Sequence, residues 1–180
     1  MQVTTTRFDS IEVESDDIVT FPEGLPGFDE AREFVFLPHP GGTGPFSWLQ
    51  CIDNRAGSNG LAFPVVSPWR IAPEDAPTIP GPVLRSLSID DIRTQAQIWA
   101  IVTVPRDRPH DATVNLLAPI LVNRDSRQAR QVVLLADESS LHTPLKSASR
   151  PAEQPGSSAH RNGSSSVRRI GAAREAAGRA

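Results

Sequence analysis

The chain has 180 residues, of which 38% are apolar and 22% are charged, so it can hold one globular domain and some additional length. No apolar run reaches the roughly 18–20 residues of a membrane helix, and the acidic N-terminus lacks the features of a secretory signal, so we expect a cytoplasmic protein without membrane contact. A single Cys excludes an internal disulfide framework and a cysteine-rich zinc site.

The formal net charge of −3 combines two regions of opposite sign. Residues 1–145 contain 11 Arg and no Lys against 19 Asp and Glu, whereas residues 146–180 contain seven Lys and Arg against two Glu. The second region is rich in Ser, Ala, Gly and Arg, and its few aliphatic side chains bury too little surface to offset the entropy of ordering. We therefore expect a folded domain over 1–145 and a basic, disordered tail over 146–180.

Short runs of β-branched and aromatic residues, separated by turn-forming residues, predict strands along the whole of the domain. In chain order the expected strands cover residues 3–8, 11–13, 18–21, 33–37, 46–52, 61–66, 97–104, 113–122 and 131–136. Seventeen prolines exclude long helices. The pattern predicts a mostly β protein, a small antiparallel β-barrel-like single domain with one or two short helices.

Helical signals are few. Asp29 is a possible N-cap for one turn over residues 28–32, and residues 82–87 start with Pro and have apolar residues at helical spacing. Ser88 stands three residues before Asp91, which is the spacing of a capping box before a second short helix. Residues 167–177 offer at most a marginal basic helix, because the segment is short and contains Gly171.

The sequence contains no recognisable catalytic constellation. The four His are scattered through loop and tail contexts without metal-ligand spacing, and the glycine-rich 41–44 lacks the Lys of a phosphate-binding loop. Cys51 lies in an apolar strand, where a single Cys is usually a small buried hydrophobe. We expect no enzyme activity, no metal and no cofactor.

Two segments suggest a role in binding. Residues 18–28 contain prolines and glycines that impose one tight path, so Leu25 and Phe28 either plug the core or form an apolar ledge for a partner. Residues 101–105, followed by 113–123, form continuous apolar runs that are expected to be buried on both faces or to bury one face against something else, and Pro119 indicates an edge or a bulge. An interrupted edge strand is a plausible docking site for a helix or an added strand.

These segments occur in an order that resembles the FliW family of flagellar assembly factors. The resemblance covers about residues 3–145 and rests on IVTFPEGLPGF (18–28), LAFPVV (61–66), IVTVP (101–105), TVNLLAPI (113–120) and HTPL (142–145). It implies a non-enzymatic cytoplasmic protein that binds flagellin and the RNA-binding translational regulator CsrA. It also implies that, once flagellin is exported, the freed protein sequesters CsrA and relieves the repression of flagellin mRNA.

An acidic domain independently favours a basic partner, since complementary charge speeds encounter, although acidity also serves solubility alone. The residues that we expect at a partner interface are Leu25, Phe28, Asn115, Leu117, Pro119 and Asn123; each is also explained by a role in the core or a turn. Two alternatives stay open. One is a small barrel that binds a ligand or a flavin through Arg124, Arg127 and Arg130. The other is an RNA-binding barrel that uses the basic tail, since the domain itself lacks a nucleic-acid surface.

Overall fold

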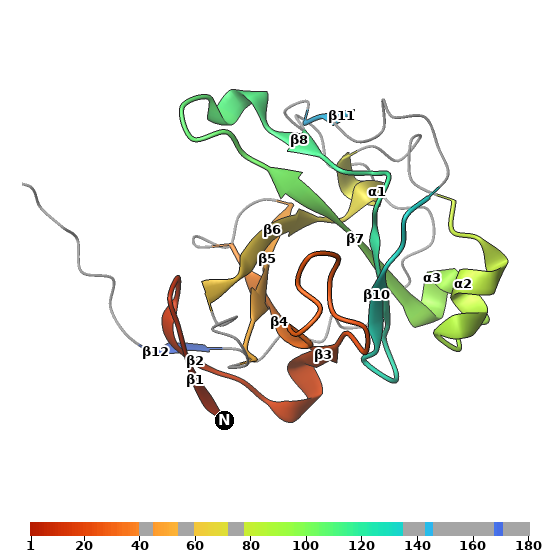
Figure 1. The fold of residues 1–180 in the computed structure, drawn as a ribbon, viewed down its shortest axis with the longest axis horizontal. Coiled ribbons are helices and arrows are strands. Elements are labelled where there is room, and N and C mark those ends of the chain that lie inside the picture. Colours follow the sequence, from red (N-terminus) through yellow and green to blue (C-terminus); the bar gives the residue numbers. More distant parts are fainter. Residues whose placement is uncertain (40–44, 54–59, 72–77, 135–142, 146–167, 171–180) are drawn as a thin grey trace, which may run out of the picture.

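The computed structural model describes residues 1–39, 45–53, 60–71, 78–134, 143–145 and 168–170 (Figure 1). Within these residues the chain is mostly β. A curved main sheet has the strand order β10-β9-β7-β6-β5-β4-β3, and a smaller sheet has the order β1-β2-β12. All ladders are antiparallel, which confirms the predicted fold class.

The main sheet begins with β3 (Ile18–Thr20) and continues through β4 (Glu33–Pro38), β5 (Phe46–Cys51), β6 (Ala62–Val66), β7 (Ala96–Thr103), β9 (Ile120–Asn123) and β10 (Ala129–Gln131). Two short strands, β8 (Thr113–Val114) and β11 (Thr143–Pro144), extend it beside β7. The smaller sheet contains β1 (Gln2–Thr5), β2 (Asp9–Glu12) and β12 (Arg168–Ile170).

The main sheet is rolled like a barrel but is not closed. Its first and last strands approach each other at one isolated parallel bridge between Thr20 and Gln128, and the Thr20 amide donates to the Arg127 carbonyl at 2.9 Å. No ladder joins β3 to β10 in the part of the chain that the structure describes. The open seam is therefore held by side chains and by a few loop hydrogen bonds.

The inner face of the rolled sheet holds the main core. Phe21 and Phe34 meet edge-on with ring centroids 5.0 Å apart, and Leu49, Ile120 and Val122 pack around them without solvent exposure. Cys51 belongs to the same cluster and is fully buried, as predicted for a small hydrophobe. The alternation of side chains along the strands sends every second residue into this core.

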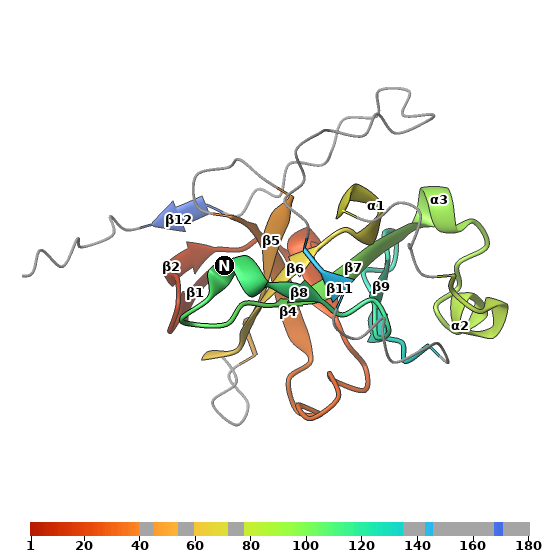
Figure 2. The ribbon, with the colours of Figure 1, turned by 90° about the horizontal axis from the view of Figure 1, so that it is seen from above.

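The outer face carries three separate apolar clusters, which lie at different places along the sheet. The β1–β2 hairpin packs Val3 and Ile11 against Val35 and Leu37. Helix α2 (Gly81–Ser86) and its C-terminal turn cover Ile98 and Leu121, while α1 (Pro68–Ile71) and β8 cover Ala100 and Val102. Figures 1 and 2 show the hairpin and α2 at opposite ends of the molecule.

The helices differ in part from the prediction. Three short α-helices occur, and α2 contains Pro82 in its first turn as predicted. The capping-box interpretation of Ser88 was wrong: Asp91 is the N-cap of α3 (Ile92–Gln95), and its carboxylate accepts the Arg93 amide at 2.9 Å. The turn expected over residues 28–32 is not a helix, because the Ala31 amide reaches back only to the Phe28 carbonyl.

The strand expected over residues 113–122 was also wrong, because the structure divides it into β8 and β9. The break follows from Asn115, whose side-chain oxygen accepts the Leu117 and Ala118 amides at 3.0 Å and so turns the chain. Pro119 lies in this break rather than at a sheet edge, since β9 pairs with both β7 and β10. All four residues of β9 are buried, as expected for a continuous apolar run.

The boundary of the predicted tail falls directly after β11. Most of residues 146–180 lie outside the described part of the chain. Within that part, Arg168–Ile170 form β12, an extended strand, where the sequence had suggested at most a marginal helix.

Candidate partner-binding surface

The β3–β4 loop (residues 21–32) follows one fixed path over the core. Gly24 and Gly27 have φ values of 74° and 83°, and a Cβ at Gly24 would lie 2.6 Å from the backbone of Asp29. The Gly24 amide donates to the Phe21 carbonyl at 3.0 Å, and the Phe28 amide donates to the Leu25 carbonyl at 2.7 Å. Only glycine adopts this left-handed backbone without strain at so close an approach.

Leu25 and Phe28, the two apolar residues of the loop that the sequence indicated, lie in different environments. Leu25 is 2% exposed and packs into the main core, so it is the plug. Phe28 is 40% exposed and rests edge-on against Phe63, with ring centroids 5.7 Å apart. The loop thus buries one side chain to fix its position and presents the other at the surface.

Three half-buried aromatic residues accompany Phe28 along the inner face. Phe63 stands beside Leu49 in the ladder, Leu49 stands beside Phe36, and Phe36 stacks on Trp99 with ring centroids 4.8 Å apart and a 24° angle between the planes. We call Phe28, Phe36, Phe63 and Trp99 the aromatic patch. Half-buried aromatic side chains provide large contact area at low entropic cost, which suits a protein interface.

Acidic side chains are concentrated in the same part of the chain. Residues 1–33 contain nine of the 19 carboxylates of the domain and only two Arg. Seven of these carboxylate side chains are exposed, namely those of Asp9, Glu12, Glu14, Asp16, Glu23, Asp29 and Glu30. Three of the seven, Glu23, Asp29 and Glu30, belong to the β3–β4 loop itself. A partner for this region needs apolar side chains for Phe28 and positive charge around them.

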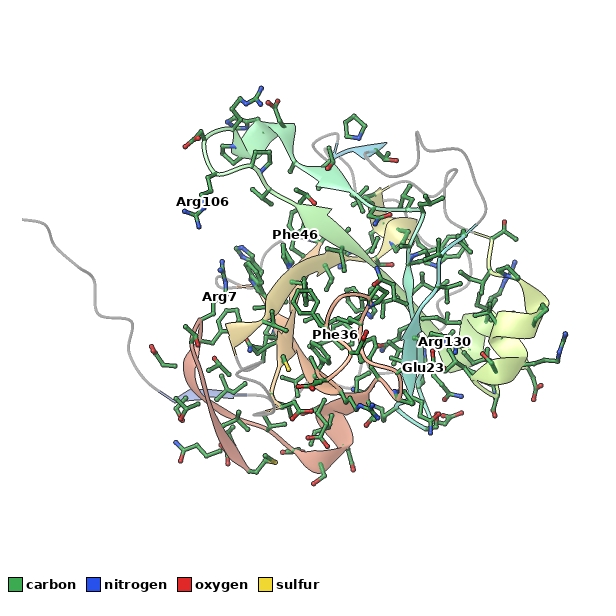
Figure 3. The ribbon with its side chains drawn as sticks, in the orientation of Figure 1. Arg7, Glu23, Phe36, Phe46, Arg106 and Arg130 are labelled. Atoms are coloured by element: carbon green, nitrogen blue, oxygen red, sulfur yellow. The ribbon has the colours of Figure 1, made fainter. Side chains whose placement is uncertain are left out.

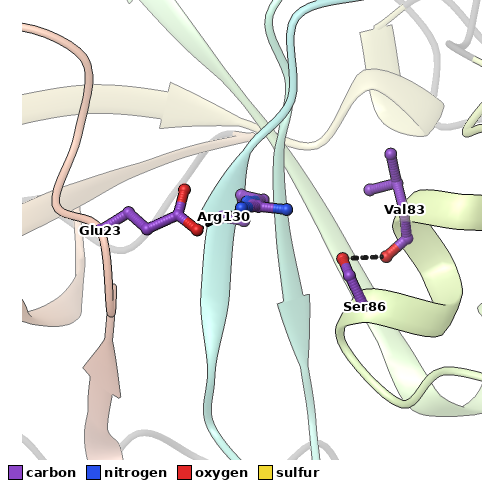
Figure 4. Close-up of polar contacts among 4 residues, drawn as sticks. All are labelled: Glu23, Val83, Ser86 and Arg130. Carbon is purple, nitrogen blue, oxygen red and sulfur yellow. Dashed lines mark hydrogen bonds and ion pairs between the residues drawn. The ribbon is translucent and has the colours of Figure 1, made fainter.

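An ion pair joins the β3–β4 loop to β10, the last strand of the main sheet, across the open seam. Figures 3 and 4 show Glu23 facing Arg130 of β10, and a guanidinium nitrogen of Arg130 donates to Glu23 Oε1. The two side chains remain 70% and 39% exposed, so the pair is screened by solvent and contributes little to stability. It does help to fix the position of the loop across the open seam.

The remaining predicted interface residues have structural roles. Asn123 is 3% exposed, and its Nδ2 donates to the carbonyls of Leu87 and Ser88 at 2.8 and 3.3 Å. Pro119 is buried, and its carbonyl accepts the Val132 amide. Asn115 and Leu117 are half-buried in the connection between β8 and β9. Among the six predicted residues, Phe28 is therefore the one that the structure presents openly to solvent.

The three arginines of the ligand-binding alternative are each bound within the protein. Arg124 donates to the Ala96 carbonyl at 3.0 Å, Arg127 donates to the Asp17 carbonyl at 3.0 Å, and Arg130 pairs with Glu23. Burial lowers the pKa of Arg127 below its ordinary value, and Asp17 opposes that shift. Guanidinium groups held by three different acceptors do not converge on one phosphate.

Sequence reasoning did not identify Phe36, Phe63 and Trp99 as surface candidates. Each looks like an ordinary inward residue of an alternating strand, and only the rolled sheet and its open seam decide how far such residues are covered. The concentration of acids within the first 33 residues is visible in the sequence and is a signal for this surface. In the described residues no three potential metal-binding side chains cluster, and no helix has the length and apolar character to span a membrane.

Comparison with known proteins gives a consistent result. Residues 2–145 match the family model described as FliW protein. The flagellar assembly factor FliW of Bdellovibrio bacteriovorus is 37% identical over 145 residues, which are 81% of this chain and 79% of that protein. FliW of Heliobacterium modesticaldum is 39% identical over 134 residues, covering 74% and 83% of the two chains. A crystal structure of the flagellar assembly factor FliW superposes with a TM-score of 0.68 at 28% identity, over 81% of this chain and 97% of that one.

Proposed function

Because the chain belongs to the FliW family of flagellar assembly factors, we propose that it acts in flagellar assembly as a cytoplasmic, non-enzymatic protein that binds flagellin and the translational regulator CsrA. Binding to CsrA antagonises it and so relieves the repression of flagellin mRNA translation. Flagellin occupies the protein until it is exported, and the freed protein then captures CsrA.

The observation that carries this proposal is the exposed Phe28 within the acidic β3–β4 loop. Glu23, Asp29 and Glu30 belong to the same loop and are all exposed. An RNA-binding regulator is basic, because it must neutralise phosphates. The overall positive charge of such a protein speeds its encounter with these carboxylates, and the contact itself lies away from its RNA-binding surface. Phe28 supplies a central apolar contact of the kind that dominates interface energetics.

The same surface suits an amphipathic helix such as a flagellin terminus. Phe28 and the half-buried Phe63 beside it provide an apolar contact, and the acids of the same loop favour basic residues on the partner helix. Two partners that need the same Phe28 exclude each other, which gives the exchange between flagellin and CsrA a physical basis.

The test is isothermal titration of the purified full chain with CsrA and with flagellin, each alone and then in competition. We expect both partners to bind, and we expect flagellin already bound to block CsrA. Raising the salt from about 0.05 M to about 0.5 M weakens the CsrA complex, since surface charges are then screened. If neither CsrA nor flagellin binds at the lower salt concentration, the proposal is wrong.

A matched pair of variants identifies the surface. Glu30→Gln and Asp29→Asn together remove two charges beside Phe28, whereas Asp107→Asn and Asp111→Asn remove two exposed charges in the β7–β8 connection. We expect the first pair to slow association with CsrA and the second pair to leave it unchanged. Equal effects of the two pairs would indicate that only net charge matters and that the β3–β4 loop is not the interface.

A further inference from the structure

The β1–β2 hairpin receives a third strand from the other end of the chain. β12 pairs antiparallel with β2, so that Arg168 stands opposite Glu12, Arg169 opposite Ile11 and Ile170 opposite Ser10. On its other side β2 pairs with β1. Figures 1 and 2 both show β12 beside the hairpin, away from the helices α2 and α3.

The edge of β2 that β12 covers favours a positively charged strand over a neutral or acidic one. An uncovered edge offers backbone N–H and C=O groups to any extended segment, which is a route to unwanted pairing between proteins. Glu12 and Asp9 of β2 are exposed, and Glu14 and Asp16 follow directly after the strand. A strand that adds here gains both backbone hydrogen bonds and the attraction of these carboxylates if it carries positive charge.

The segment that lies there has matching properties. Residues 146–180 contain seven Lys and Arg against two Glu, and two of the seven stand next to each other in β12. The hairpin belongs to the first 33 residues, which hold nine acids and two Arg. Opposite charge in the two terminal parts of one chain favours their association over pairing with a neutral segment.

We propose that the outer edge of β2 is a docking site for a basic strand, and that the chain fills it in cis with its own Arg168–Ile170. The tail thereby shields the hairpin from edge-to-edge pairing with other proteins. A protein that adds a basic strand at this edge must first displace the tail. The tail therefore lowers the apparent affinity of this edge for such a protein. The site is separate from Phe28 and does not depend on the proposed binding of CsrA or flagellin.

Hydrogen–deuterium exchange of the full-length protein tests the pairing. In the variant Arg169→Pro with Ile170→Pro, one of the two prolines removes the N–H that faces β2, because successive N–H groups of a strand point to opposite sides. The Val13 amide donates to the Met1 carbonyl, so by alternation the amides of Ser10 and Glu12 are the ones that face β12. We expect these two amides to exchange about tenfold faster than in the unmodified chain, while those of Asp9, Ile11 and Val13, which face β1, and those of β4 keep their rates. The variant Arg169→Gln with Ile170→Thr has the same net charge as the double-proline variant but keeps both N–H groups. We therefore expect it to retain most of the protection.

A second measurement separates charge from backbone pairing. Arg168→Gln removes the charge of the residue paired with Glu12 and is expected to reduce the protection of the Ser10 and Glu12 amides, more strongly at low salt. Arg179→Gln removes an equal charge from the tail outside β12 and serves as its control. A synthetic peptide of residues 164–174, added to the double-proline variant, is expected to restore the protection.

Each other outcome overturns the proposal. Equal exchange of the Ser10 and Glu12 amides in the unmodified chain and in the double-proline variant shows that the tail does not pair with β2. Equal loss of protection in the Gln/Thr control shows that the side chains, and not the strand, are responsible. Protection that rises with protein concentration shows that the strand comes from a second copy and not from the same chain.

Discussion

The side chain of Asn123 donates a hydrogen bond of 2.8 Å to the carbonyl of Leu87, which lies 36 positions earlier in the chain. Its Oδ1 accepts the amides of Asp125 and Ser126 at 2.8 and 3.0 Å. One buried amide thus joins the end of β9 to the C-terminal turn of α2 and shapes the turn toward β10. This residue, expected at a partner interface, is instead a structural junction.

Asn123→Ala is expected to lower the free energy of unfolding by about 2–4 kcal/mol, because several buried backbone groups lose their partner. Asn115→Ala is the matched control, since its side chain also accepts two nearby amides, those of Leu117 and Ala118, and within the described part of the chain both bonds stay inside the β8–β9 connection. We expect it to cost about 1 kcal/mol. Urea unfolding followed by tryptophan fluorescence measures both. An Asn123→Ala chain as stable as Asn115→Ala would show that the link to Leu87 contributes nothing.

Gly24→Ala is expected to destabilise the protein by about 3 kcal/mol, since it combines a left-handed backbone with a clash against Asp29. Gly27→Ala is expected to cost about 1 kcal/mol, because the backbone is equally left-handed but the space around it is open. Thermal unfolding of the two variants separates the clash from the backbone strain. If both lose equal stability, the close approach at Asp29 has no energetic consequence.

Phe28→Ala is expected to weaken the binding of CsrA or flagellin about tenfold or more while costing about 1 kcal/mol of stability, because the ring is 40% exposed and contacts Phe63 only at its edge. Val104→Ala, at a residue 49% exposed in another loop, is the control and should leave binding unchanged. Titration calorimetry gives the affinities and urea unfolding gives the stabilities. Equal affinity of the Phe28→Ala chain and the unmodified chain would remove Phe28 from the interface.

Asp91 gives a prediction for acidic pH. Its carboxylate accepts the Arg93 amide and the Thr94 hydroxyl, and these hydrogen bonds lower its pKa below the ordinary value of 3.8. A lowered pKa means that the capping contribution is complete above pH 3.8 and is lost as the pH falls through the lower, folded-state value. We therefore expect Asp91→Ala to destabilise the protein at neutral pH and to approach the unmodified chain in stability at strongly acidic pH.

Urea titrations of both proteins across the acidic range measure this difference. Asp90→Ala provides the control, because the neighbouring carboxylate does not accept the Arg93 amide that caps α3. A difference between Asp91→Ala and the unmodified chain that stays constant down to strongly acidic pH would show that the charge of Asp91 does not contribute to the cap.

The local sequence determined most of the strands and the path of the β3–β4 loop. The strand cores of β4, β5, β6 and β7 agree with their expected positions, because their period of two follows from side chains alternating between the faces of a sheet. Gly24 and Gly27 marked the loop, because few other residues adopt its backbone angles. The motifs of residues 18–28 and 113–120 were also sufficient to indicate the family.

Tertiary structure decided which of those residues face solvent. Leu25 and Phe28 look equivalent in the sequence, yet Leu25 packs into the main core while Phe28 is exposed, because the path of the loop over the sheet aims one inward and the other outward. Asn123 looks like a polar residue at a strand end, yet it bonds to Leu87, a partner that only the packing of α2 on the sheet brings near. Sequence patterns report local backbone preference and the alternation of faces, whereas exposure and long-range pairing depend on which distant elements the chain folds against.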